Sequence, residues 1–281
     1  MLAKADGSLL LQTGRAAIMG ILNATPDSFS DGGLFLAVDD AIDHVAGMIE
    51  EGADIIDIGG ESTRPGAAAV SADEEMQRVI PIIEGLAKRF DVLISIDTSK
   101  ALVMNAAVQA GAGMINDVRA LNEKGALSTA AELNVPVCLM HMQGQPGTMQ
   151  HNPVYDDVTT DIRDYLSQRV ANCVEAGLDI SNLILDPGFG FGKTRKQNFT
   201  LLNQLEQIRV HNLPVLAGLS RKSVIEQTLG LGVNDRVYAS IALTLLAVRN
   251  GANIVRVHDV KATTDAIRMV EAVEAEKRKS K

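Results

Sequence analysis

Short apolar runs alternate with helical patterns along almost the whole chain, and this alternation restricts the possible folds more than any other feature. Each run is short enough to be a buried strand, and most runs end at a polar residue. Buried strands that alternate with helices predict a parallel sheet. We expect eight such strands, at residues 16–22, 54–58, 92–96, 113–115, 135–140, 183–185, 213–219 and 254–257.

Eight strand–helix units in 281 residues predict an α/β fold, a closed (β/α)8 TIM barrel. An open doubly wound sheet is the alternative, but it would carry GxGxxG after its first strand, and GILNATPDSFSDGG does not match that pattern. No linker divides the chain, so residues 1–281 are expected to form one domain, with an N-terminal extension at 1–15 and a solvated tail at 276–281. Helical patterns occupy residues 39–50, 71–88, 100–110, 125–133 and 156–176, part of 236–249, and a last segment to about 274.

Composition excludes several classes of partner. The net charge of -9 and an aromatic content of 3% argue against a nucleic-acid-binding surface. No apolar run approaches the roughly 20 residues of a membrane helix, and the N-terminus lacks a signal-peptide pattern. Cys138 and Cys173 have no zinc spacing and predict buried thiols. We therefore expect a cytoplasmic protein that binds small molecules, without nucleic-acid or membrane partners.

Polar residues gather where the predicted strands end, which is where a TIM barrel carries its active site. A single polar residue there could be a helix cap or a turn former. So many polar strand ends together indicate a binding site instead. The residues concerned are Asn23, Thr63, Arg64, Asp97, Asn116, His141, Asp186, Lys222, Arg256 and His258.

These residues divide by chemistry into two groups. Asp97, Asn116, Asp186 and Lys222 suit a flat, nitrogen-rich heterocycle, because a carboxylate accepts two parallel N–H bonds and the amide and ammonium groups supply donors. The second group consists of donors that suit a phosphate or diphosphate: Asn23, Thr63, Arg64, Arg256 and His258.

The assignment of Arg256 has an alternative, since Asp57 or Asp259 could be its ion-pair partner. Two long connections, residues 23–38 and 61–70, contain Gly or Pro and are predicted to close over substrates. Phe29 and Pro65 are apolar residues within these connections.

The segment LILDPGFGFGK, residues 183–193, predicts a buried strand that delivers Asp186 to its carboxyl end. Its three glycines would let the following loop approach a ligand closely. Lys193 receives only a solvated or supporting position in this interpretation.

The motifs, in their order along the chain, resemble the bacterial dihydropteroate synthase family. They are GILNATPDSFSDGG, DIGGESTRPGA, SIDTSK, INDVRAL, VCLMHMQGQPGTMQ, LILDPGFGFGK, GLSRKS and IVRVHDV, and they span about residues 18–260. Two small departures are Ala24, where the family usually has Val, and Leu219, where Met is common. Neither side chain has a reactive or hydrogen-bonding group, so neither departure casts doubt on activity.

The resemblance implies a pterin-binding TIM-barrel transferase of folate biosynthesis. Such an enzyme condenses 7,8-dihydropterin-6-ylmethyl diphosphate with p-aminobenzoate, releases diphosphate by SN1-like departure, uses Mg2+, is a sulfonamide target and is usually a homodimer. It implies catalytic roles for Asp97, Lys222, Arg256 and His258.

The resemblance also distributes the substrate contacts. The implied pterin residues are Asp97, Asn116, Met140, Asp186 and Lys222. The implied diphosphate residues are Asn23, Thr63, Arg64, Arg256 and His258, with Asn23 also a metal ligand. The implied p-aminobenzoate residues are Phe29, Thr63, Arg64, Pro65, Phe191, Ser220 and Lys222.

Two other functions remain open on the sequence alone. Methyltransferases that act on methyltetrahydrofolate share the barrel and the pterin pocket, but they would not need the SRKS and RVH anion residues together with the TPDSFSDGG loop. A non-enzymatic pterin- or phosphate-binding protein would be expected to lack some of the strand-end charges, and none is missing here.

Overall fold

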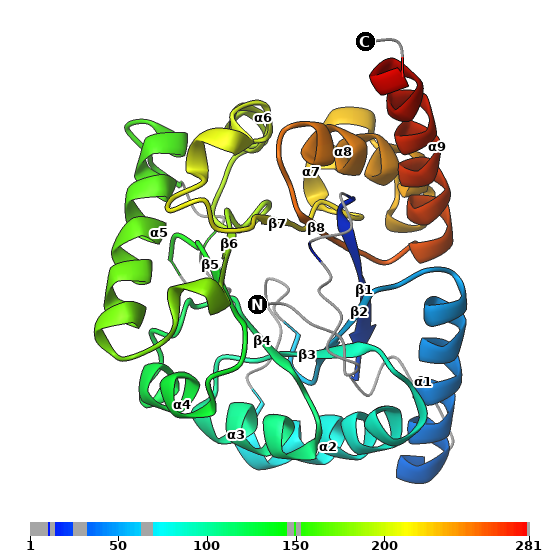
Figure 1. Ribbon diagram of the computed structural model, residues 1–281, viewed down its shortest axis with the longest axis vertical. Helices are drawn as coiled ribbons and strands as arrows, with labels where there is room; N and C mark the ends of the chain where they lie inside the picture. The colour runs from blue at the N-terminus through cyan, green and yellow to red at the C-terminus, as the bar shows by residue number, and fades with distance from the viewer. Residues whose placement is uncertain are drawn as a thin grey trace.

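The chain folds into a nearly closed barrel of parallel strands surrounded by helices (Figure 1). The computed structural model describes residues 11, 15–24, 33–62, 70–144, 149 and 153–279, with residues 33–37 and 277–279 described by backbone alone. The eight strands are paired in the order β6-β5-β4-β3-β2-β1-β8-β7. The predicted (β/α)8 architecture is therefore confirmed, and the open doubly wound alternative is wrong.

The strands match the predicted apolar runs closely except at the seventh position. Their bounds are β1 (Ala17–Asn23), β2 (Ile55–Gly59), β3 (Leu93–Asp97), β4 (Met114–Asp117), β5 (Val137–Met140), β6 (Leu183–Asp186), β7 (Leu216–Ala217) and β8 (Ile254–Val257). Residues 213–219 were expected to form a full strand, but β7 keeps only two residues. It meets β6 through a single parallel bridge between Leu185 and Val215.

The helices confirm most of the predicted segments. Their bounds are α1 (Gly33–Glu50), α2 (Ala72–Arg89), α3 (Ala101–Ala110), α4 (Ala126–Leu133), α5 (Val158–Glu175), α6 (Arg195–Asn203), α7 (Ser223–Leu229), α8 (Val237–Arg249) and α9 (Val260–Lys279). Helix α1 begins six residues before the expected start at 39, so the first long connection is shorter than predicted. The sequence interpretation missed α6 and α7, which are only nine and seven residues long.

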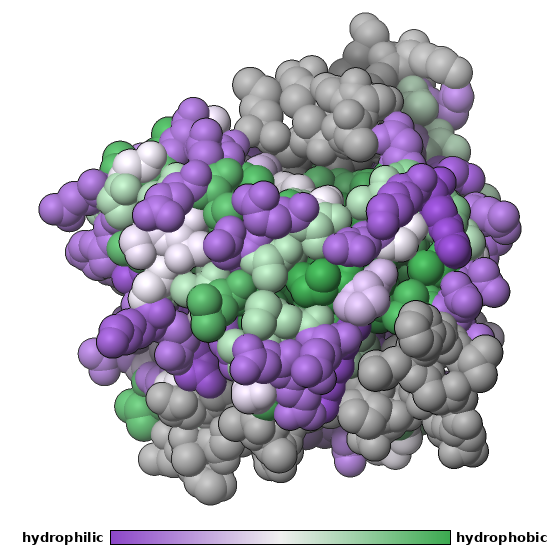
Figure 2. Space-filling model, turned by 90° about the horizontal axis from the view of Figure 1, so that it is seen from below, coloured by the Kyte–Doolittle hydropathy of each residue, from purple (hydrophilic) through white to green (hydrophobic). Residues whose placement is uncertain are grey.

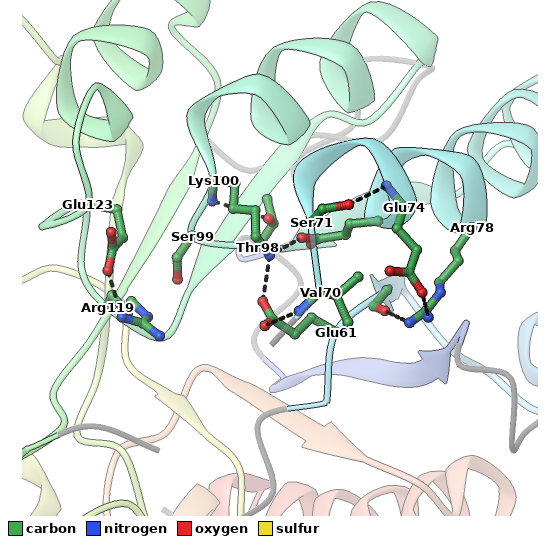
Figure 3. Close-up of polar contacts among 12 residues, drawn as sticks. Glu61, Val70, Ser71, Glu74, Arg78, Thr98, Ser99, Lys100, Arg119 and Glu123 are labelled. Carbon is green, nitrogen blue, oxygen red and sulfur yellow. Dashed lines mark hydrogen bonds and ion pairs between the residues drawn. The ribbon is translucent and has the colours of Figure 1, made fainter. Parts of the chain in front are cut away.

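Helix α2 begins at the cap that the sequence predicts. The Ser71 hydroxyl accepts a hydrogen bond from the Glu74 backbone N–H at 3.2 Å, which satisfies one of the unpaired donors of the first turn. The Glu74 carboxylate pairs with Arg78, one turn further on (Figure 3). The serine half of the predicted capping box is thus present, while the Glu74 side chain makes an ion pair on the helix surface.

An apolar layer fills the inside of the barrel at its amino-terminal end. Every strand contributes to it, through Ala17, Met19, Ile55, Leu93, Met114, Cys138, Ile184, Leu216 and Ile254. Because side chains alternate between the two faces of a strand, the intervening residues point outward and form the larger core between sheet and helices. The same alternation decides which residues face the site above this layer.

The protein surface and the two cysteines have the properties expected from the amino-acid composition. On the side of the barrel shown in Figure 2, hydrophilic residues are interspersed with apolar ones. Cys138 and Cys173 are buried and unbridged, as predicted. Within the described residues, no helix has the combination of length and apolar character that crossing a membrane requires.

Candidate active site

A polar layer lies two residues beyond the apolar layer on the inner face of the barrel. In each case the pleat of the strand places the second residue on the same face as the first. Asp57 follows Ile55, Asn116 follows Met114, Asp186 follows Ile184, and Arg256 follows Ile254, while Met140, which follows Cys138, is an apolar member of the same layer. The strands are parallel, so all these side chains meet at the carboxyl ends, where the sequence predicts the site.

Asp57 is the centre of this layer and was not predicted as a site residue. Its carboxylate is fully buried, and Oδ2 accepts hydrogen bonds from Asn116 Nδ2 at 3.0 Å and from Arg256 Nε at 2.6 Å. Arg256 Nη2 also donates to Asp97 Oδ2 at 2.7 Å. Four strands are thereby joined through one buried network. The spacing from Ile55 could have identified Asp57, whereas a search restricted to strand ends passes over it.

The ion pairs of this region resolve the alternatives for Arg256. Its carboxylate partners are Asp57 and Asp97, and Asp259 pairs instead with Arg221, at 2.5 Å between Oδ1 and Nη2. The sequence interpretation assigned Arg256 to the anion group and Asp97 to the heterocycle group. The structure brings these two residues into direct contact, so the groups adjoin at Arg256.

Burial shifts the pKa of the acidic side chains upward. Burial raises the pKa of Asp97 to about 7, and the neighbouring Asp57 adds to the rise while the Arg256 charge opposes it. Burial likewise raises the pKa of Asp186 to about 6, against the stabilising hydrogen bond from the Gly188 N–H. Both carboxyl groups consequently titrate much nearer to neutrality than ordinary aspartates do.

The cationic side chains are shifted by the same surroundings. Burial and the Arg256 charge lower the pKa of Lys222 to about 8, although Asp186 and Asp97 oppose the shift. The pKa of Arg256 itself is raised, because Asp57 and Asp97 together outweigh its burial. Perturbed groups of both signs in one cluster are typical of binding and catalytic sites.

The segment 183–193 forms a strand end and a tight loop, as predicted. Asp186 Oδ1 accepts the Gly188 N–H at 2.7 Å. Gly188 has a φ of 68°, and a Cβ there would lie 1.9 Å from the carbonyl oxygen of His141, so only glycine fits. The loop then carries Phe191, whose ring centroid lies 4.0 Å from Lys222 Nζ.

Ser220 and His258 meet across β7 and β8. Ser220 Oγ lies 3.0 Å from His258 Nδ1 and accepts the His258 backbone N–H at 3.2 Å. Burial, followed by the charge of Arg256, lowers the pKa of His258 to about 4. The imidazole is therefore neutral at physiological pH. The structure brings together these two residues, which the sequence interpretation placed in different subsites.

A charged cluster ties together the two ends of the second long connection (Figure 3). Glu61 Oε1 accepts the Val70 backbone N–H at 3.2 Å, and Lys100 Nζ contacts Glu61 Oε2 at 2.6 Å. Lys100 also pairs with the fully buried Glu75 at 2.5 Å. Lys100 lies three residues after Asp97. The two ends of this connection, at Glu61 and Val70, are therefore held near the carboxyl end of β3, which carries the predicted site residue Asp97.

Several predicted residues lie outside the part of the chain that the structure describes. They are Phe29, Thr63, Arg64 and Pro65. The structure consequently gives positions for the whole heterocycle group and for only part of the anion and amine groups.

The predicted metal ligand Asn23 lies at the exposed carboxyl end of β1. Among the described residues, no three His, Cys, Asp or Glu side chains gather in a way that could hold a metal ion. Mg2+ commonly keeps several waters and binds proteins through few ligands together with substrate phosphates. The amide oxygen of Asn23 is a ligand of the kind that such an ion accepts.

Known proteins are similar to this chain in sequence and in fold. A profile of the family described as pterin binding enzyme matches residues 19–258. The dihydropteroate synthase of Escherichia coli strain K12 is 54% identical over 255 residues, which are 91% of this chain and 90% of that protein. The Yersinia pestis dihydropteroate synthase, solved with a sulfonamide drug complex, has a TM-score of 0.92 at 51% identity, over 98% of this chain and 99% of that chain.

A second solved structure gives the same result. The Xanthomonas albilineans dihydropteroate synthase with 4-aminobenzoic acid has a TM-score of 0.87 at 51% identity, covering 93% of this chain and 94% of that chain. These matches extend over nearly the whole barrel, including every described strand end discussed above. The chain therefore belongs to the dihydropteroate synthase family of pterin-binding enzymes.

Proposed function

We propose that the protein condenses 7,8-dihydropterin-6-ylmethyl diphosphate with p-aminobenzoate to give 7,8-dihydropteroate and diphosphate, and that sulfonamides compete with the amine. The observation that carries this proposal is the buried network of Asn116, Asp57, Arg256 and Asp97 at the carboxyl ends of the strands. Family membership and the relatives bound to 4-aminobenzoic acid and to a sulfonamide support the choice of substrates.

The pterin is assigned to the acidic end of the site. Asp97 and Asp186 accept N–H bonds from the ring, and Lys222 donates to a ring oxygen or nitrogen. Asn116 Nδ2 donates a hydrogen bond to Asp57, so the amide oxygen of Asn116 is the atom that can accept a hydrogen bond from the ligand. Met140, buried on β5 beside Gly188, packs against the ring. As diphosphate leaves, the two carboxylates stabilise the electron-poor pterin cation.

The diphosphate is assigned to Arg256, His258 and Asn23. Neutral His258 presents Nε2–H, because Ser220 accepts the backbone N–H of His258 and has its own hydrogen available for Nδ1. Arg256 stabilises the charge that develops on the leaving oxygen as the C–O bond breaks. A Mg2+ ion carried on the diphosphate, with Asn23 as its protein ligand, would supply further charge neutralisation. Thr63 and Arg64 complete this end by resemblance.

The amine is assigned to the space beside Phe191, Ser220 and Lys222, completed by resemblance with Phe29, Thr63, Arg64 and Pro65. An aryl amine is already neutral at pH 7, so the site needs no strong base. Once the C–O bond has broken, the amine nitrogen adds to the methylene carbon of the pterin cation on the face opposite the diphosphate, a C–N bond forms, and the nitrogen loses a proton to water. Holding both reactants in this geometry supplies as much as about 7–11 kcal/mol of the rate acceleration.

The proposed assembly is a cytoplasmic homodimer. Buried, unbridged Cys138 and Cys173 support a reducing compartment. The contacting helices α8 and α9 support the dimer through exposed apolar side chains, Tyr238, Leu246, Met269 and Val273. Sedimentation at several concentrations checks the dimer, and a single monomeric species throughout would contradict it.

The experiment for the function measures diphosphate release with the dihydropterin diphosphate as substrate, with and without p-aminobenzoate. We expect release that depends on the amine and is inhibited competitively by a sulfonamide. Diphosphate release at the same rate with and without p-aminobenzoate would contradict the proposed reaction, and so would an absence of diphosphate release when p-aminobenzoate is present.

A further inference from the structure

Lys193 is a buried lysine that the proposed reaction does not use. The residue is 3% exposed, so the solvated position considered for it is wrong. Its Nζ lies 2.8 Å from the Gly188 carbonyl oxygen, 2.9 Å from the Phe191 carbonyl oxygen and 3.1 Å from His141 Nδ1. Burial lowers the pKa of Lys193 to about 7, and in its protonated form the amine has three hydrogens for three neutral acceptors, so its donors are then fully used inside the protein.

The two carbonyl groups that Lys193 holds are the two ends of one turn. Phe191 N–H donates to the Gly188 carbonyl oxygen at 3.1 Å, and Lys193 Nζ bridges that oxygen to the Phe191 carbonyl. Gly188, Gly190 and Gly192 all have positive φ, at 68°, 80° and 60°. Glycine-rich backbone loses much conformational freedom on folding, so this turn needs fixed contacts to keep one shape.

The turn fixes the position of Phe191, whereas the pairing of β6 with β5 fixes the position of the Asp186 backbone. Asp186 lies on β6 in register with Met140 of β5, and its carbonyl oxygen accepts the His141 N–H at 2.9 Å. Phe191 has no strand to hold it, and its ring lies under Lys222 Nζ. Lys193 therefore acts directly on the backbone carbonyls of Gly188 and Phe191, and it reaches Asp186 through its charge and through Gly188, whose N–H donates to Asp186.

We propose that Lys193 is a positioning residue for the amine-binding half of the site. It holds the turn from Gly188 to Phe191 so that the Phe191 ring stays against Lys222, without touching either substrate. This role rests on the proposed function, because that function assigns Phe191 to the p-aminobenzoate subsite and Lys222 to both subsites. It predicts a larger effect on the amine than on the pterin.

The test compares Lys193→Met with the unsubstituted protein in steady-state assays that vary each substrate in turn. Methionine keeps a long, unbranched side chain but donates no hydrogen bonds. We expect the KM for p-aminobenzoate and the Kd of a sulfonamide to rise by about tenfold, equivalent to about 1.4 kcal/mol. The KM for the dihydropterin diphosphate should rise by less than the KM for p-aminobenzoate, since the loss of the Lys193 charge removes only one of the interactions that lower the pKa of Asp186.

Lys196→Met is the matched control, since this lysine is exposed on α6 and the substitution is the same. Its kinetics should equal those of the unsubstituted protein. If Lys193→Met does not fold, Tyr155→Phe replaces it as the test, because the Tyr155 hydroxyl donates to the Gly192 carbonyl in the same loop at 2.7 Å. A smaller change in the same direction, confined to the amine, supports the proposal.

Equal rises in both KM values, or a fall in kcat with both KM values unchanged, would overturn the positioning role. An absence of any split in Tyr155→Phe would do the same where the lysine variant cannot be purified. Failure of the unsubstituted protein to release diphosphate in the presence of the amine would contradict the proposed function itself. The two failures are therefore distinguishable within one set of assays.

Discussion

The Arg256 guanidinium donates from Nε to Asp57 Oδ2 at 2.6 Å, although the two residues are 199 positions apart in the chain. The contact joins β8 to β2 across the inside of the barrel. It leaves Nη2 of the same arginine for Asp97, at 2.7 Å. Because Asp57 also holds Asn116, a carboxylate with no assigned substrate contact fixes the direction of two proposed ligand-binding side chains.

Replacing Asp57 by Asn should preserve the shape of this network and remove its negative charge. We expect the pKa of Asp97 to fall below about 7, since the Asp57 charge contributes to its rise. We also expect kcat/KM for the dihydropterin diphosphate to fall by about tenfold and the free energy of unfolding by about 1–3 kcal/mol. A pH titration of pterin binding measures the pKa. Ser95→Ala, at the neighbouring position in register, should leave it unchanged, and an unshifted value in Asp57→Asn would contradict the argument.

Arg256→Ala should weaken binding of a phosphate-free pterin as well as that of the diphosphate. Loss of the arginine charge raises the pKa of Asp97 further, so less of the carboxylate form is present at neutral pH. We expect the phosphorylated substrate to lose about 100-fold in affinity or more, and the phosphate-free pterin to lose less and to recover above about pH 8. Calorimetry with both ligands tests this, with the exposed Arg249→Ala as control. Unchanged binding of the phosphate-free pterin would mean that the contact with Asp97 has no energetic consequence.

Binding of a phosphate-free pterin should follow a bell-shaped dependence on pH. The acceptor form of Asp97 exists above its pKa of about 7, so affinity rises as the pH increases through that value. The donor form of Lys222 exists below its pKa of about 8, so affinity falls above that value. Fluorescence titrations from pH 5.5 to 9.5 measure both limbs. Asp97→Asn should remove the inflection near 7, and its persistence in that variant would assign it to another group.

Gly188→Ala should be far more destabilising than the same change at Gly177. Both glycines have positive φ, but a Cβ at Gly188 would lie 1.9 Å from the His141 carbonyl oxygen, whereas a Cβ at Gly177 meets nothing within 4 Å. We expect a loss of about 3 kcal/mol or more at Gly188 and about 1–2 kcal/mol at Gly177, where only backbone strain remains. Chemical denaturation measures both. Equal losses would show that the backbone conformation, and not the close approach of β5, requires glycine at 188.

The parts of the fold that depend on local patterns were predictable from the sequence. Buried parallel strands are continuous apolar runs, so their positions, the parity of their side chains and the barrel class follow from spacing. The short helices α6 and α7 were missed because nine and seven residues make too few turns for a clear apolar stripe. The length of β7 was overestimated because most of the other apolar residues in 213–219 are buried without sheet pairing, the bridge at Val215 excepted.

The positions of the candidate residues were more predictable than the contacts among them. Asp97, Asn116, Asp186 and Lys222 were predicted from strand ends, and the structure places them at the carboxyl end of the barrel, where the Asp97 and Asp186 charges act on the pKa of Lys222. The role of Asp57 depends on contacts with residues on β4 and β8, which sequence spacing alone does not specify. The same holds for Lys193, whose three partners come from a turn and from the end of β5.

The single bridge between β6 and β7 leaves the barrel with one weak joint, and the proposed amine pocket straddles it. Phe191 follows one side of this joint and Lys222 the other, so their separation depends on side-chain contacts more than on a hydrogen-bond ladder. Local opening should therefore begin there, and amides of β7 should exchange with solvent faster than those of β2. Opening at this joint would move the two sides of the proposed amine pocket apart while the regular pairing of the other strands stays intact.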